Sequence, residues 1–450
     1  MFQIREKLVA VCSVLAGLSL LGMSARAFAG DAATQNLTLR NRVGGGNIVT
    51  HLAGAPTEQM YQALRGVGAR LGRVNSYGWR DLDRKPVPRN FDAAMKEAHQ
   101  RGITPILLLE YDGSYQFLQP PQPIGSYLDW FAAGQALARR FRPNGEWGME
   151  NGIYDWGATL FTAINEPDVL ANIPRDAYRE ALAGFADGVH NIDRTLRVVP
   201  AGFATCNSAN DMTLRGYGPA IADLLEDGRL DGIDLHTYYN AQFYPLTRGH
   251  DFSAQNCFDG VKKAMGIKRD TNFYATEFNV TRVGDWADPK LSARLFLTAF
   301  WDEMGVVGAD GKRSATVLAM PWNLSDTGKA EGPGYAMAAA KAPWKPEVRS
   351  QVLRRILDLA GDMTFVSLDH RDGRYLLESE KAQLLIWQNL PGWTTAPGKV
   401  WDVQLPAWAD RVELWGWDGK RRDIRVSGGK AVIDGLTGSE TYMLHIPRPR

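Results

Sequence analysis

Apolar residues follow two patterns along the chain, one with the spacing of an amphipathic helix and one in short continuous runs of strand length. Residues Phe91–Arg101 place apolar side chains at helical spacing and stop at Gly102, a residue favoured just after a helix. Ile103–Leu109 is then an almost unbroken apolar run, which is typical of a strand buried on both faces. A helix followed by such a strand predicts one unit of a parallel sheet covered by helices.

This unit recurs as far as about residue 360. The other expected strands are Asn47–Thr50, a run ending at Arg73–Asn75, Thr159–Ile164, Val198–Phe203, Gly232–Tyr238, Phe273–Glu277 and Thr316–Met320. Eight such units predict an α/β fold, a closed (β/α)8 TIM barrel with long loops. A doubly wound open sheet is the alternative, but it usually has a glycine-rich turn after its first strand. Gly44–Gly46 precedes the first expected strand instead.

The pattern changes beyond about Asp362. Short alternating runs appear there, separated by turn signals such as Asp372-Gly373, Asp418-Gly419 and Gly428-Gly429. They predict a small antiparallel β-sandwich packed on the barrel. We therefore expect a signal peptide over residues 1–29, a catalytic barrel over 30–362 and an accessory β-sandwich over 363–450.

The N-terminus has the pattern of an export signal. Arg5 and Lys7 precede the apolar stretch Leu8–Met23, and Ala27-Phe28-Ala29 is a small-x-small cleavage site. We expect an exported protein, periplasmic or secreted. An uncleaved inner-membrane anchor stays open, although the stretch is shorter than the roughly 20 residues of a membrane span.

Composition limits the classes of ligand that the protein is expected to bind and the disulfides that it could form. Lysine and arginine (51) nearly balance aspartate and glutamate (50), which gives no reason to expect a nucleic-acid partner. The 14 tryptophans suit a sugar ligand, although most should lie in the core. After cleavage two of the three cysteines remain, Cys206 and Cys257, and a disulfide between them stays open.

Two carboxylates stand at the ends of predicted strands. Glu166 follows one strand within Asn165-Glu166-Pro167, and Glu277 ends another about 110 residues later, which is three βα units. That spacing places them on strands four and seven, at the mouth where barrel enzymes keep their reacting groups. Cleavage of a glycosidic bond needs such a pair, and a separation of roughly 5 Å predicts retention of anomeric configuration. Taken alone, either residue could be a salt-bridge partner.

Other polar residues end the neighbouring strands. Asp234, His236 and Tyr238 alternate with apolar residues, so all three point to one face. Such polarity on an inward face is costly unless it is used, yet His236 alone could be a structural histidine. Arg73 could equally be an ion-pair former, and Glu110 is the main rival carboxylate.

The ordered set of Asn-Glu-Pro, His-x-Tyr, Glu and Trp resembles the retaining (β/α)8 glycosidases. With the phrases AINEPD and ATEFN, the chain is most similar to glycoside hydrolase family 39, and within it to endoglycosidases of bacterial exopolysaccharide systems. The resemblance implies that Glu166 is the acid/base and Glu277 the nucleophile. It further implies that Asn165 binds the sugar 2-hydroxyl and Tyr238 orients the nucleophile, and that the residues lining subsite −1 are His236, Arg73 and Trp322. It implies no metal and no organic cofactor.

The expected function is therefore a retaining glycoside hydrolase, endo-acting on a bacterial exopolysaccharide, with a polysaccharide or oligosaccharide substrate. The aromatic residues expected to line its groove include Tyr115, Trp156, Phe243 and Tyr244. The long loops after strands three and four, which hold Tyr115, Trp130, Trp147 and Trp156, are expected to set the choice of substrate. An exo-acting xylosidase or an endoglucanase is the first alternative. A non-catalytic glycan-binding part of a polysaccharide export complex is the second, and association with such a complex stays open. No protein partner is required.

Overall fold

A computed structural model describes residues 36–49, 57–76, 89–110, 124–168, 173–204, 217–239, 253–280, 288–322, 337, 346–370, 372–389, 400–436 and 440–449. The expected signal peptide, Cys206, Tyr115, Phe243 and Tyr244 lie outside these residues. No helix among the described residues combines the length and apolarity needed to cross a membrane.

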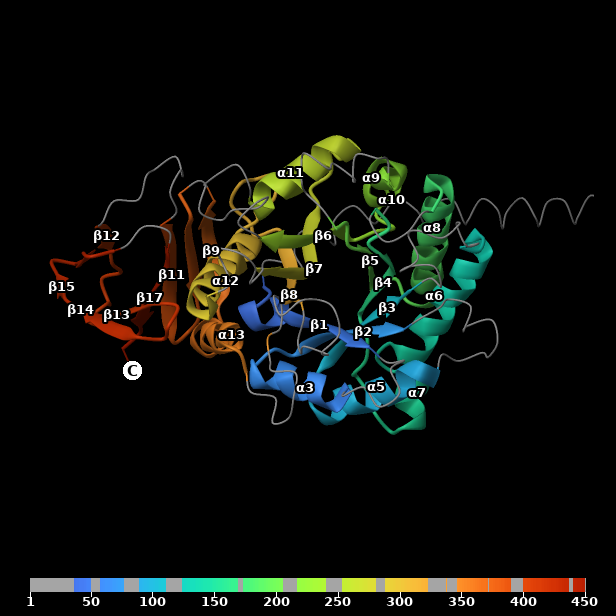
Figure 1. Cartoon of the computed structure of the whole chain (residues 1–450), viewed down its shortest axis with the longest axis horizontal. Helices are drawn as coiled ribbons and strands as arrows, with labels where there is room; N and C mark the ends of the chain where they lie inside the picture. The colour runs from blue at the N-terminus through green and yellow to red at the C-terminus, as the bar shows by residue number, and fades with distance from the viewer. Residues whose placement is uncertain are drawn as a thin grey trace, which may run out of the picture.

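Eight parallel strands follow one another around a barrel (Figure 1). Two parallel bridges, Phe203 to Leu235 and Val43 to Ala319, join a five-stranded sheet to a three-stranded one and so close the ring. The α/β barrel predicted from the sequence is thereby confirmed. The strands are β1 (Gly44–Val49), β2 (Leu71–Ser76), β3 (Thr104–Leu109), β4 (Leu160–Asn165), β5 (Arg197–Ala201), β6 (Gly232–Tyr239), β7 (Asn272–Val280) and β8 (Thr316–Pro321).

Helices surround this barrel, and some of them begin at a residue whose side chain accepts from a free backbone N–H group. Ser126 and Asp129 form a reciprocal capping box at the start of one helix, and Asp288 caps another whose first residue is Pro289. The helices are η1 (Leu39–Arg42), α3 (Thr57–Gly66), α5 (Arg89–Gln100), α6 (Tyr127–Phe141), α7 (Glu146–Glu150), α8 (Arg175–Ile192), α9 (Tyr217–Ala220), α10 (Ala222–Glu226), α11 (Ala254–Met265), α12 (Pro289–Met304) and α13 (Val348–Ala360).

The first strand differs from its prediction. It begins at Gly44, so the three glycines lie inside β1 rather than before it. A Cβ on Gly44 would lie 3.0 Å from the carbonyl oxygen of Leu71 and 3.1 Å from the Met320 side chain. Glycine at this position therefore reflects the close approach of the neighbouring strands inside the barrel. It does not mark a turn before the strand, as the sequence pattern had predicted.

The C-terminal residues form an antiparallel β-sandwich, as predicted. A six-stranded sheet in the order β14-β13-β17-β11-β10-β9 faces a three-stranded sheet in the order β12-β16-β15. Trp387, Trp401, Val403 and Leu444 belong to the buried core between them. The strands are β9 (Thr364–Asp369), β10 (Arg374–Glu378), β11 (Ala382–Asn389), β12 (Trp401–Gln404), β13 (Val412–Trp415), β14 (Arg421–Ile424), β15 (Val426–Ser427), β16 (Lys430–Ile433) and β17 (Glu440–Pro447).

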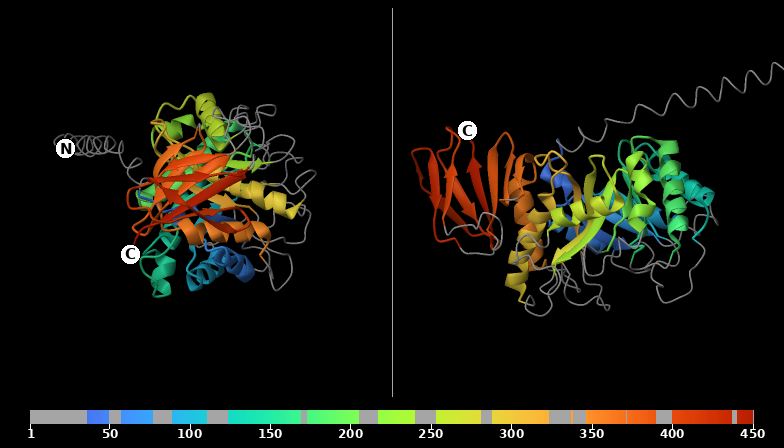
Figure 2. Two further views of the ribbon diagram at one scale, coloured as in Figure 1. Left: turned by 90° about the vertical axis from the view of Figure 1, so that its left-hand side faces the viewer. Right: turned by 90° about the horizontal axis from the view of Figure 1, so that it is seen from above.

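Helix α12 joins the two parts. It lies between the barrel and the sandwich, which sits at one end of the long axis (Figure 2). The hydroxyl groups of Thr298 and Thr441 are 2.8 Å apart across this junction, and Gln388 donates to the carbonyl of Thr298 at 2.9 Å. One continuous apolar core runs through barrel and sandwich residues. The sandwich is thus part of the packing of the barrel.

Cys257, in α11, is disulfide-bonded. Its partner lies outside the described residues. A disulfide between Cys257 and Cys206, which the sequence leaves open, is thus not tested by the described residues.

Candidate active site

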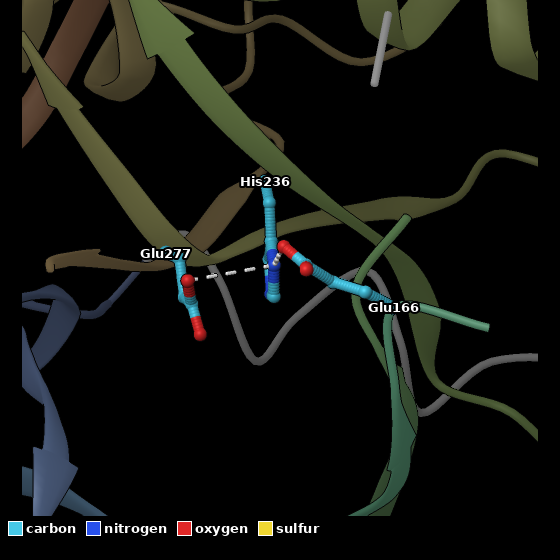
Figure 3. A group of neighbouring side chains, drawn as sticks. All are labelled: Glu166, His236 and Glu277. Atoms are coloured by element: carbon cyan, nitrogen blue, oxygen red, sulfur yellow. Dashed lines mark hydrogen bonds and ion pairs between the residues drawn. The ribbon is translucent and has the colours of Figure 1, made fainter. Parts of the chain in front are cut away.

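Polar side chains meet at the carboxyl ends of the barrel strands. Glu166 directly follows β4, His236 and Tyr238 lie near the end of β6, and Glu277 lies in β7. One carboxylate oxygen of Glu166, one of Glu277 and a ring nitrogen of His236 lie within 4.8 Å of one another (Figure 3). Such proximity matches the spacing of roughly 5 Å between the two carboxyl groups of retaining glycosidases.

Glu277 is held as an anion. Arg73, from β2, and the hydroxyl of Tyr238 each donate a hydrogen bond to a different carboxylate oxygen of Glu277. Burial would raise the pKa of this carboxyl, but the charges of His236 and Arg73 and these two hydrogen bonds outweigh it and lower the pKa. An ionised carboxylate with two fixed donors is a suitable nucleophile.

The backbone that presents Glu166 is strained. Ile164 has a φ of 63° and Glu166 a φ of 43°, both in the left-handed region that a β-branched residue such as isoleucine rarely adopts. The pairing of β4 with β5 shifts register between Ala163 and Asn165 at the same point. Strain of this kind costs on the order of 1–3 kcal/mol per residue and commonly marks a functional site.

His236 lies between the two carboxylates. Its Nδ1 is 2.6 Å from Glu166 Oε1 and 3.7 Å from Glu277 Oε2. Burial would lower the pKa of the imidazole, but the charges of Glu277, Glu166 and Asp234 and the hydrogen bond with Glu166 raise it to about 9. His236 is therefore a cation at neutral pH.

The other predicted residues lie at the same mouth. The Asn165 side chain is buried, and its Oδ1 has no hydrogen-bond partner among the described residues, so it can accept from a ligand hydroxyl. The ring of Trp322 stands edge-on to that of Tyr238 at 6.0 Å between centroids. Glu110, the rival carboxylate, accepts instead from the backbone N–H of Asn165 at 3.4 Å, which gives it a positioning contact.

Two residues of the site were missed or left without a role by the sequence reasoning. Thr276 Oγ1 contacts His236, Asp234 and Arg73. Asp168 accepts the backbone N–H of Ala204 on both carboxylate oxygens at 3.1 Å. Burial raises the pKa of Asp168 to about 7, against the Ala204 hydrogen bond and assisted by the charge of Glu166. Its place two residues after Glu166 was the available signal.

The same cluster offers three ligand atoms of the kind that metals bind. However, these ligand atoms already have partners, because Arg73 donates to Glu277 and His236 Nδ1 lies 2.6 Å from Glu166 Oε1.

The prediction that these aromatic residues line the groove or set the choice of substrate is wrong where the structure describes them. Trp130 lies in α6 and Trp147 in α7, both in the core, and Trp156 packs against Trp147 and His99. All three precede the start of β4, whereas Glu166 follows its end. They belong to the segment that connects β3 to β4, and their apolar surface is used for packing.

The comparisons with known proteins bear on the fold. No protein-family model and no curated protein matches the sequence. Among solved structures, the chain is similar to a family 39 glycoside hydrolase from the gut symbiont Bacteroides cellulosilyticus WH2, with a TM-score of 0.57 and 15% identity over 92% of this chain and 83% of that one. A family 39 β-xylosidase from Caulobacter crescentus gives 0.58 and 14%, over 92% and 99% of the two chains.

A family 30 subfamily 8 xylanase from Clostridium acetobutylicum is also similar, with a TM-score of 0.56 and 12% identity over 93% of this chain and 98% of that one. Because members of families 39 and 30 both match, the likeness does not single out family 39. The chain has the fold of the (β/α)8 glycoside hydrolases.

Proposed function

We propose that this protein is a retaining glycoside hydrolase. The observation that carries the proposal is the pair of carboxylates at the ends of β4 and in β7, with oxygens within 4.8 Å of each other. An inverting pair would stand roughly 6.5–9.5 Å apart to leave room for a water molecule. The shared fold of the solved glycoside hydrolases supports the same reading.

The roles follow from the surroundings of each carboxylate. Glu277 attacks the anomeric carbon, while Glu166 protonates the departing oxygen and the glycosidic bond breaks. Glu166 then removes a proton from water, whose oxygen attacks the anomeric carbon and releases Glu277 as a carboxylate. Arg73 and Tyr238 hold the nucleophile, and Asn165 presents its amide oxygen to a sugar hydroxyl.

Trapping of the covalent intermediate tests this proposal. The wild-type protein is incubated with 2-fluoro glycosides of glucose, mannose, galactose and xylose that carry an activated leaving group, and its peptides are analysed by mass spectrometry. We expect one peptide to gain a glycosyl group at Glu277. Glu110→Gln should be labelled at the same place, and Glu277→Gln should not be labelled. Labelling at Glu110 would refute the assignment.

We further propose that the enzyme belongs with family 39 and cleaves a bacterial exopolysaccharide internally. The motif order Asn-Glu-Pro, His-x-Tyr, Glu, Trp supports this. An endo enzyme shortens the polymer early, so size-exclusion chromatography of a digested exopolysaccharide should show an early fall in chain length. Release of xylose alone would favour a xylosidase. Binding of polymer without cleavage by the wild type would favour a glycan-binding component of an export complex.

We also propose that the protein is exported. The charged, apolar and small-residue regions of the first 29 residues support export. Expression of the full chain, fractionation and N-terminal sequencing should find mature protein that starts at Gly30. A membrane-bound, full-length product would show instead that the segment is an anchor.

A further inference from the structure

A chain of hydrogen bonds leads from Glu166 to a second buried carboxylate. Glu166 Oε1 lies 2.6 Å from His236 Nδ1, and His236 Nε2 lies 3.0 Å from Thr276 Oγ1. Thr276 in turn donates to Asp234, at 2.7 Å from its hydroxyl and 3.0 Å from its backbone N–H. All the links except Glu166 are buried, so water does not compete for them.

The hydroxyl of Thr276 fixes the direction of this chain. A hydroxyl group has one proton to donate and two lone pairs that accept. Asp234 takes the proton, and Arg73 donates to one lone pair at 3.3 Å. The remaining lone pair faces His236 Nε2, so this nitrogen must carry a proton. The tautomer of His236 is therefore set by Thr276 and Asp234.

The contact between His236 and Glu166 then holds a single shared proton. With Nε2 protonated, a separation of 2.6 Å between Nδ1 and Oε1 requires a hydrogen between them. The ring of His236 and the carboxyl of Glu166 therefore share this proton. The ring is packed closely against Gly202, where an added Cβ would lie 2.0 Å from Nε2.

We propose that His236 stores the proton that Glu166 delivers, and that Thr276 and Asp234 are positioning residues that leave Nδ1 as its only exchanging nitrogen. In glycosylation the shared proton passes to the departing oxygen, which leaves a neutral ring and a carboxylate. In deglycosylation Glu166 accepts a proton from water, and the proton returns to the bond with Nδ1. Protons balance over the cycle. We rest this inference on the proposed function, because it concerns the same acid/base.

The charged and titratable groups that act on His236 come from several elements. The anionic or acidic groups are Glu166 and Asp168, which follow β4, Asp234 on β6 and Glu277 on β7. The guanidinium of Arg73, on β2, lies near Thr276. Because anions outnumber cations here, the ring keeps its proton to higher pH than a free imidazole. The proton shared by His236 and Glu166 should therefore remain available until His236 loses it at alkaline pH.

NMR spectroscopy of the ring nitrogens tests the proton without any substrate. The full-length mature protein is labelled with 15N-histidine, and the His236 signals are assigned by their loss in His236→Asn. We expect Nε2 to stay protonated from pH 6 to 10, with only Nδ1 titrating at alkaline pH. Glu166→Gln should lower the midpoint of this titration by about one pH unit or more. A bare Nε2 at neutral pH would overturn the inference, even in an active enzyme.

The pH dependence of kcat/KM is the second test of this inference. Thr276→Val removes the acceptor of Nε2, so the alkaline limb of the kcat/KM profile should move to lower pH by about one unit, with the largest losses for poor leaving groups. Thr276→Ser keeps a hydroxyl and should restore the wild-type limb. Thr162→Val is the matched control, because Thr162 is a buried strand threonine whose hydroxyl donates to the Leu107 carbonyl at 3.4 Å and contacts none of the residues of the hydrogen-bond chain described above.

The two failures are distinguishable. If Thr276→Val keeps the wild-type alkaline limb while Glu277 is still labelled by fluoro glycosides, His236 does not store the proton and the glycosidase assignment stands. If no glycoside labels Glu277 and no polymer is cleaved, the proposed function fails. In that case the catalytic part of the inference fails with it, and the NMR titration still reports where the proton lies.

Discussion

A buried carboxyl on α12 should make the protein less stable as pH rises. Glu303 is fully buried and accepts hydrogen bonds from Thr237 at 2.5 Å and Tyr239 at 2.6 Å, both on the face of β6 opposite His236. Burial raises its pKa from 4.5 to about 8, against these two hydrogen bonds and assisted by the charge of Asp302. Glu303→Gln should therefore weaken the dependence of stability on pH.

The sign follows from where the proton is bound. The unfolded chain releases the Glu303 proton above about pH 4.5, whereas the folded protein keeps it until about pH 8, so rising pH favours the unfolded state between these values. The full difference corresponds to about 5 kcal/mol. Between pH 6 and pH 9 this one group should cost roughly 2.5 kcal/mol of stability.

Guanidinium unfolding followed by tryptophan fluorescence at pH 6, 7, 8 and 9 measures the effect. The wild type should lose more stability than Glu303→Gln over this range, by roughly 2–3 kcal/mol. At pH 6 the variant should be the less stable protein, because its amide nitrogen would replace Oε2, which has no hydrogen-bond partner among the described residues.

Two comparisons secure the interpretation. His236, whose raised pKa also gives stability that is lost as pH rises from about 6.5 through about 9, is present in both proteins, so its share cancels. Glu180→Gln, at an exposed position of α8, should keep the wild-type slope. Parallel pH dependences of the wild type and Glu303→Gln would refute the reasoning, because Glu303 would then be ionised in the fold.

Three further outcomes are expected. Tyr238→Phe removes a hydrogen bond that lowers the pKa of Glu277, so the acid limb of kcat/KM should move to higher pH, with a loss of roughly 10- to 100-fold at low pH; an unmoved limb would contradict this. Gly202→Ala should lower kcat by about 100-fold or more through displacement of His236, while Gly102→Ala, which has a similar positive φ but nothing within 4 Å of its Cβ, should keep normal activity. Removal of residues 363–450 should give an insoluble barrel, because the core is continuous across α12; a soluble, active fragment would contradict this.

The sequence alone determined the barrel and the positions of its two carboxylates. Apolar runs of strand length separated by amphipathic helices predict parallel strands, and parallel strands bring their carboxyl ends to one mouth. The location of Glu166 and Glu277 at one mouth of the barrel follows from that rule and does not depend on the conformation of the loops. The same reasoning failed for Trp130 and Trp147, because composition does not show whether an aromatic ring faces a ligand or the core.

Only the tertiary structure decided which side chains of the site contact one another. Strict alternation along β7 would point Thr276 away from Glu277, yet a single guanidinium, that of Arg73, donates to both side chains. Register shifts where β7 pairs with β6 and β8 allow this, because a bulge inserts residues that alternation does not count. Such a bulge depends on both neighbouring strands, which lie tens of residues away in the sequence. The pattern of one strand therefore cannot reveal it.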